Sequence, residues 1–190
     1  LIDSYIGAEE SQKISSFDDL SLVELLVERG ADAINELPES ITKNQEAVAE
    51  TIENNLRKVI IDEMPVNPKY YERMSVLLDE IIKERKQEVK NYKDYLDQVV
   101  ELSKKVKNPG GTSTYPSNIN TTAKRALYDN LNQDKELAEK IDYTVLYTKK
   151  DSWRGNKIKE REVKYAIAEY IKDEEELERV FELVKNQKEY

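Results

Sequence analysis

Apolar residues recur at intervals of three and four along most of this chain, and the pattern is strongest over residues 68–107. From Pro68 the apolar stripe continues for several turns and predicts a helix to about residue 89. Asn67 marks its start, because Asn caps a first turn and the following Pro needs no N–H there. A second stripe, after a short turn, predicts a helix to about Lys107. Adjacent amphipathic helices with a short connection usually lie antiparallel, so we expect a long helical hairpin over 68–107.

The same spacing predicts further helices on both sides of this hairpin. Capping residues precede the apolar stripes near Asp18, Thr42, Thr121, Asp134 and Asp173, and another stripe begins at about Lys157. Residues 143–148, YTVLYT, are β-prone by composition, but an isolated strand is not stable. We interpret them as the end of a helix or an extended crossing. The chain is therefore expected to be all-α, with about eight helices and a C-terminal helical bundle.

Turn residues divide the chain into two helical regions. The segment NPGGTSTYPSNI, residues 108–119, predicts a loop by its Pro, Gly and small polar content. It separates a region at 17–107, which contains the hairpin, from a bundle at 120–190, and we expect the two to form a single compact domain. Residues 1–16 have weak periodicity and are expected to be a poorly ordered lead-in. Because the chain begins LIDSY without Met, we expect it to be an excised part of a longer protein.

Composition supports the helical interpretation and limits the compartment. Charged residues make up 36% of the chain and hydrophobic residues 38%, with only five Gly and five Pro, which is typical of a heavily solvated helical protein. The absence of Cys suits a reducing compartment. No apolar run approaches the length of a membrane span, and the N-terminus lacks a signal pattern. We expect a cytoplasmic protein with no membrane partner.

The sequence offers few groups for catalysis. It contains no His, the usual general acid–base residue and metal ligand, and no Cys for thiol chemistry. Glu84-Arg85-Lys86 matches the end of a metal-dependent nuclease motif, but it lies within a predicted helix and not on the strand hairpin that such a site needs. We therefore expect no catalytic residue, no metal site and no cofactor site in this chain.

One segment stands out by its charge. Residues 149–164 hold seven Lys or Arg against three acids, within a chain whose net charge is −9. In the predicted helix the cations repeat on the side opposite the apolar stripe, and the only Trp lies just before it. Trp and Arg are enriched at interface hot spots. We propose as candidate contact residues for a partner or DNA Trp153, Arg154, Lys157, Arg161 and Lys164. The commoner meaning of such a pattern is a solvated surface helix that offsets acidic neighbours.

Four aromatic residues lie near these cations, namely Tyr143, Tyr147, Trp153 and Tyr165. Aromatic side chains beside cations can stack on the bases of single-stranded nucleic acid. Aromatic residues in a small helical protein more often belong to its core, and no groove or sheet platform is evident here. We therefore favour the core interpretation over base stacking for these four residues, and Trp153 beside Arg154 could equally be an interface anchor.

Three blocks of the sequence resemble the C-terminal helical region of the R (motor and restriction) subunit of type I restriction-modification enzymes. They are YYERMSVLLDEIIKERKQEVKNYKDYLDQVVELSKKV at 70–106, YPSNINTTAKRALYDNL at 115–131 and IDYTVLYTKKDSWRGNKIKEREVKYAIAEY at 141–170. The resemblance extends over nearly the whole chain from about Phe17. Its specificity rests on the order of the blocks and on the strings RALYDNL and WRGNKIKEREVK.

The resemblance implies a docking role within a larger enzyme. In that family a nuclease domain and two motor domains, which use ATP and Mg²⁺ to pull double-stranded DNA, precede a helical domain that docks on the methyltransferase core of M and S subunits. No nuclease or helicase motif of the family matches this chain, so ATP and Mg²⁺ belong to the parent subunit. The implied partners are the M and S subunits, the subunit's own motor domains and, through the parent complex, DNA.

Two alternatives remain open. The basic face of the helix from Lys157 could touch DNA as it passes between the motor and the methyltransferase core. The chain could also be a free-standing helical adaptor without a restriction role. An independent enzyme is a more distant third possibility, because no catalytic motif is present in the sequence.

Overall fold

The computed structural model describes residues 21–87, 91–111 and 115–190, and every regular element in these ranges is helical. The all-α prediction is confirmed. The expected lead-in at 1–16 and the helix start at Asp18 lie outside the described residues. The elements are α1 (Leu22–Arg29), the 3₁₀ helix η2 (Gly30–Glu36), α2 (Glu39–Thr42), α3 (Gln45–Glu63), α4 (Pro68–Lys86), α5 (Tyr92–Lys107), α6 (Thr122–Asn130), α7 (Lys135–Thr148), α8 (Lys157–Ile167) and α9 (Glu174–Lys185).

Side-chain caps fix most helix starts. Asn67, Thr121, Asp134 and Asp173 each accept a hydrogen bond from a backbone N–H of the first turn, as the sequence predicts. The start predicted at Thr42 is wrong: Thr42 ends α2, and the Asn44 side chain caps α3 instead. The short loop leaves two polar residues that could serve as a cap, and the structure uses the second.

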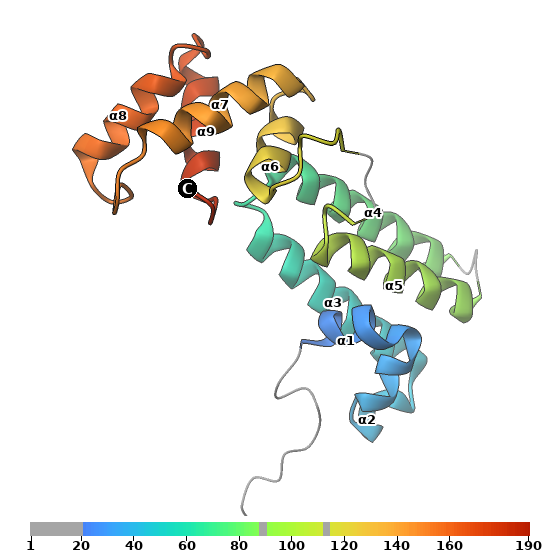
Figure 1. Ribbon diagram of the computed structural model, residues 1–190. Helices are drawn as coiled ribbons and strands as arrows, with labels where there is room; N and C mark the ends of the chain where they lie inside the picture. The colour runs from blue at the N-terminus through green and yellow to red at the C-terminus, as the bar shows by residue number, and fades with distance from the viewer. Residues whose placement is uncertain (1–20, 88–90, 112–114) are drawn as a thin grey trace, which may run out of the picture.

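Helices α4 and α5 form the expected antiparallel hairpin (Figure 1). At one end the Tyr70 hydroxyl donates to the Lys105 carbonyl oxygen over 2.8 Å, and at the other Gln98 Nε2 lies 3.5 Å from Glu84 Oε2. Residues 143–148 form the last turns of α7, which confirms the helical alternative for YTVLYT. Ile141 and Val145 of α7 face the core at helical spacing, and their burial outweighs the β propensity of the segment.

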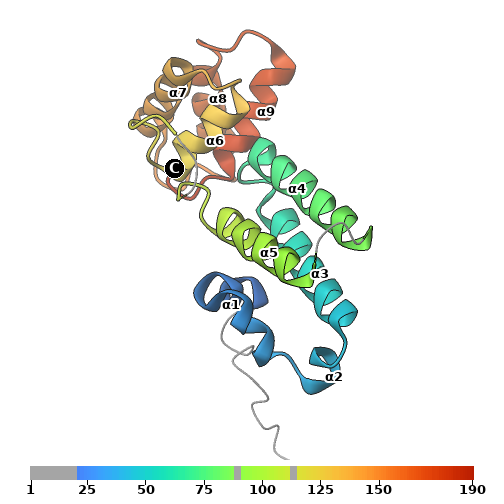
Figure 2. The ribbon, with the colours of Figure 1, turned by 90° about the vertical axis from the view of Figure 1, so that its right-hand side faces the viewer.

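The buried apolar residues form two clusters rather than one continuous core. The first contains residues between Leu22 and Val106 and is built by α1–α5, and the second contains residues between Ile119 and Tyr190 and is built by α6–α9. We call these parts the N-lobe and the C-lobe. They lie end to end, with α6 against the start of α4 (Figures 1 and 2). The loop around residues 108–119 connects the two lobes.

Candidate functional site

Trp153 lies in the loop between α7 and α8 and belongs to the core of the C-lobe. Its side chain is only 2% exposed. The indole packs on Phe181 of α9, with ring centroids 6.3 Å apart. A residue so deeply buried presents no surface to a partner in this structure, so we remove Trp153 from the candidate contact residues.

Arg154 also serves the C-lobe itself. Its guanidinium donates to the backbone oxygens of Lys185 (2.8 Å), Tyr190 (2.7 Å) and Gln187. The same group lies 4.9 Å from the centroid of the Trp153 ring. Lys185 is the last residue of α9, whose carbonyl has no partner within the helix, and the other two acceptors lie in the segment that follows it. Arg154 therefore ties the α7–α8 loop to the end of α9.

The next residues of the string WRGNKIKE turn the chain into α8. Gly155 has φ +78°, a left-handed conformation that favours Gly. Its N–H donates to Glu160 Oε1 over 2.9 Å, and the same carboxyl group lies 3.6 Å from Lys185 Nζ of α9. Asn156 caps α8 by accepting from the N–H groups of Ile158 and Lys159. The string that carries much of the family resemblance is thus a structural motif that joins α7, α8 and α9.

Most cations of residues 149–164 are paired within the C-lobe. Lys164 bonds Glu178 of α9 and lies over the Phe181 ring. The other three paired lysines are Lys149, Lys150 and Lys159, bonded to the Glu189 backbone oxygen, the Glu162 carboxylate and the Asp151 backbone oxygen. Most cations of the basic segment therefore bond their own lobe, but only Lys150 and Lys164 offset an acidic side chain.

Lys157 and Arg161 remain on the surface. Both are exposed, and neither forms a hydrogen bond or ion pair with the residues that the structure describes. They lie one turn apart on α8, so their side chains share one side of the helix. The structure separates Lys164 from them, because it turns toward α9. The expected row of three cations is reduced to these two.

Large exposed aromatic and aliphatic side chains cover the outer side of α7 and α8. Tyr147 is 82% exposed, Ile158 74%, and the other members are Tyr143, Tyr165 and Tyr170. We call these five residues the α7–α8 face. Tyr143 and Tyr147 stack with their centroids 6.0 Å apart. The core interpretation is therefore wrong for three of the four aromatics near the cations, Tyr143, Tyr147 and Tyr165, and holds only for Trp153.

Contacts between the helices place α7 and α8 side by side. The Thr144 hydroxyl lies 3.5 Å from the Tyr170 hydroxyl, and Lys150 pairs with Glu162 over 2.6 Å. Residues late in α7 thus lie beside residues early in α8, which makes the pair antiparallel. Tyr143 and Tyr147 lie on the side of α7 opposite its buried residues, and Ile158 and Tyr165 lie on the side of α8 opposite its own. The sequence could have indicated these exposed residues, because Tyr on α7 and Ile and Tyr on α8 occur opposite the apolar stripe of each helix.

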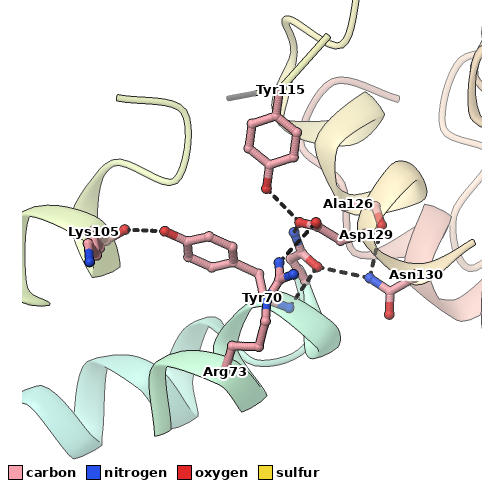
Figure 3. Close-up of polar contacts among 8 residues, drawn as sticks. Tyr70, Arg73, Lys105, Tyr115, Ala126, Asp129 and Asn130 are labelled. Carbon is pink, nitrogen blue, oxygen red and sulfur yellow. Dashed lines mark hydrogen bonds and ion pairs between the residues drawn. The ribbon is translucent and has the colours of Figure 1, made fainter. Parts of the chain in front are cut away.

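A polar cluster joins the two lobes (Figure 3). The Asp129 carboxylate of α6, whose side chain is 2% exposed, accepts from Asn67 Nδ2 at 2.8 Å, Tyr115 Oη at 2.6 Å and Arg73 Nη2 at 3.0 Å. Asn130 Nδ2 donates to Asn67 Oδ1 over 2.9 Å. Burial, together with the hydrogen bond to Asp129, raises the pKa of Tyr115 above its usual range. The bonds of Asn67 and Arg73 cross between the lobes, and Tyr115 bonds Asp129 within the C-lobe, which indicates a structural role for the cluster.

Comparison of the chain with family models, curated proteins and solved structures finds no match. Among the described residues, no group of three or more His, Cys, Asp or Glu side chains has an arrangement that would hold a metal ion. The helices that the structure describes include none that is both long and apolar enough to cross a membrane.

Proposed function

We propose that this chain is a non-catalytic helical assembly domain of the R subunit of a type I restriction enzyme, and that it docks the DNA translocase on the methyltransferase core. The α7–α8 face carries this proposal. It lies in the block at 141–170, one of the three that resemble the R subunit, and Tyr143, Tyr147 and Tyr165 are too exposed to be explained by packing in the lobe.

The composition of the face favours a protein partner. Tyr is enriched in protein interfaces, because its ring gives apolar contact area at low entropic cost while its hydroxyl remains able to hydrogen-bond. Soluble monomers rarely expose contiguous apolar patches without a function. Burial of Tyr147, Ile158 and Tyr165 against a partner would remove their apolar surface from water, which is the main favourable term in association.

Lys157 and Arg161 support the second candidate, contact with passing DNA. Two phosphate contacts would give a slope of about −1.8 when the logarithm of the binding constant is plotted against that of salt concentration. This is far weaker than the dependence expected of a full DNA-binding surface. The same two cations are also suited to the rim of a protein interface.

A binding experiment at two salt concentrations tests the proposal. The chain would be titrated with the M and S core and, separately, with nonspecific duplex DNA, at low and high salt. We expect binding to the core that persists at high salt, because apolar contacts are not screened. Binding to DNA alone, lost at high salt, would instead support the DNA-contact candidate. Binding to neither ligand would contradict both roles for the α7–α8 face.

A further inference from the structure

A groove on the N-lobe lies between α4 and α5, far in the fold from the α7–α8 face. Its volume is about 240 Å³, and its apolar lining comes from Leu77, Ile81 and Leu102. Leu102 belongs to the N-lobe core, and Leu77 and Ile81 are partly buried against it, so the floor of the groove is the edge of that core. The hairpin therefore offers the seam between two antiparallel helices, a shape that accepts a third helix.

The walls of this groove are acidic. Glu80 and Glu84 line it from α4 and Glu101 lines it from α5, whereas Lys105 is its only lining cation. Glu101 pairs with Lys104 on the solvent side of α5 over 2.7 Å. Glu80 forms no hydrogen bond or ion pair with the described part of the chain. The lining thus carries more negative than positive charge, and an occupant with cations would balance it.

A second hollow extends the apolar surface along α4. It is lined by Met64, Met74 and Val76, and it shares Leu77 and Glu80 with the groove. Val76 is 56% exposed although it occupies the middle of a long helix. The two hollows together form an apolar strip along α4 with carboxylates at its edge. We call the two hollows together the α4–α5 groove.

We propose that the α4–α5 groove docks a basic amphipathic helix of a partner protein. Apolar residues at i, i+3, i+4 and i+7 of that helix would lie on the partly exposed Leu77 and Ile81 and, further along α4, on Val76. Lys or Arg residues beside that stripe would pair with Glu80 and Glu101. The same carboxylates repel nucleic acid and acidic helices. This inference is independent of the proposed function, since it concerns another surface and the opposite charge.

The test uses a fluorescent helical peptide with a leucine stripe and lysines elsewhere, and a matched peptide with glutamates in place of the lysines. Binding to the chain is followed by fluorescence anisotropy. We expect the lysine peptide to bind and the glutamate peptide not to bind. In the double variant Glu80→Lys and Glu101→Lys, the Kd for the lysine peptide should rise about tenfold or more. The single variant Glu28→Lys, which changes an exposed acid on α1, should bind like the unchanged chain.

A label locates the bound peptide. Because the chain has no Cys, a Val76→Cys variant can carry one environment-sensitive dye, and a Glu28→Cys variant serves as its control. We expect the lysine peptide to shift the emission of the dye at position 76 only. Failure of the lysine peptide to bind would overturn the proposal, and so would equal binding of the glutamate peptide. An equal loss of affinity in Glu28→Lys, or an unshifted dye at position 76, would overturn it as well.

Discussion

A single guanidinium joins the loop before α8 to the end of α9. Arg154 donates to three backbone oxygens there, and charge-assisted hydrogen bonds are stronger than neutral ones. We predict that Arg154→Ala lowers the free energy of unfolding by about 2 kcal/mol. Arg154→Lys should recover only part of the loss, because an ammonium cannot reach three acceptors in this fork. Urea denaturation of the three proteins measures the effect, and an unchanged midpoint in Arg154→Ala would refute the assignment.

The contacts of Glu24 make the stability of the protein depend on pH. Its carboxylate accepts from Lys107 Nζ at 2.9 Å and from the Ser21 N–H at 2.8 Å. The bond from Lys107 and those from Ser21 lower its pKa from 4.5 to about 2. A depressed pKa in the folded state stabilises the protein above pH 4.5, and this stabilisation is lost as the pH falls from 4.5 to about 2.

The corresponding variant is Glu24→Gln. We predict that its free energy of unfolding depends less on pH between 4.5 and about 2 than that of the unchanged chain. The difference is small, because the side chain is partly exposed and solvent screens the pair. Chemical denaturation at several pH values measures it, with Glu28→Gln as the matched control. Parallel pH profiles for Glu24→Gln and the unchanged chain would show that Glu24 is not responsible.

The candidate contact residues in segment 149–164 show how far the role of a single residue can be predicted from the sequence. The pattern located the unusual segment, 149–164, but it proposed Trp153 and Arg154 as contact residues, whereas Trp153 is buried and Arg154, although exposed, bonds its own lobe. Their partners are Phe181 and the backbone oxygens at Lys185 and Tyr190, about thirty residues further along the chain. Charge and hydrophobicity alone do not reveal a cation whose acceptors are neutral carbonyl groups. The exposed state of Lys157 and Arg161 was predictable, because they lie opposite the apolar stripe.

At the scale of elements, one buried ion pair connects α3 with α4. The Arg85 guanidinium donates to Glu53 Oε1 over 2.8 Å, and the two side chains are 10% and 8% exposed. Arg85 also bonds Glu46, and Tyr95 of α5 donates to Glu53 over 3.2 Å. Arg85 lies on the same side of α4 as the buried apolar residues. Its spacing in the sequence continues the apolar stripe for this reason. Arg85 thus helps to pack α4 on α3.

Removing Arg85 alone should therefore lower the stability of the protein strongly. We predict that Arg85→Met lowers the free energy of unfolding by about 3 to 5 kcal/mol, because it leaves the Glu53 carboxylate buried and unpaired. The double variant with Glu53→Met should recover most of this loss, since it removes both charges. A double-mutant cycle by urea denaturation measures the coupling. Additive losses in the double variant would mean that the two side chains do not interact.

The helices themselves were largely predictable from local chemistry. Caps at Asn67, Thr121 and Asp173 depend on residues within the first turn, so the sequence contains the whole signal. The error at Thr42 arose because two polar residues compete over a short loop, and tertiary packing of α2 on α3 selects Asn44. Local propensity therefore predicts that a helix is present better than where it begins.

At the scale of the whole molecule, Asp129 couples two lobes that have separate cores. Its buried carboxylate binds Asn67 and Arg73 of the N-lobe. The loop between the lobes was predictable from its Pro and Gly content, but the polar bonds across the junction were not. They join residues about sixty positions apart, and no local pattern indicates such a pair.

We predict that Asp129→Ala uncouples the unfolding of the lobes. The only Trp, Trp153, is buried in the C-lobe, so its fluorescence reports that lobe, whereas circular dichroism reports helices of both. The two signals should give the same thermal transition in the unchanged chain and separate transitions in Asp129→Ala. Lys124→Ala, which removes a partly buried partner of Asp142 within the C-lobe, is the control. Coincident transitions in Asp129→Ala would contradict the coupling.

Docking by the apolar α7–α8 face is the central proposal, and the affinity of matched surface variants for the M and S core tests it most directly. Tyr147→Ser combined with Tyr165→Ser should raise the Kd about a hundredfold, because interface aromatics carry much of the binding energy. Lys157→Glu combined with Arg161→Glu should change it by less than about tenfold, as rim charges do. Ile61→Ser, which removes an exposed apolar side chain on α3, should leave it unchanged. Unchanged affinity in the tyrosine variant, with binding abolished by the charge reversals, would contradict docking by the apolar face.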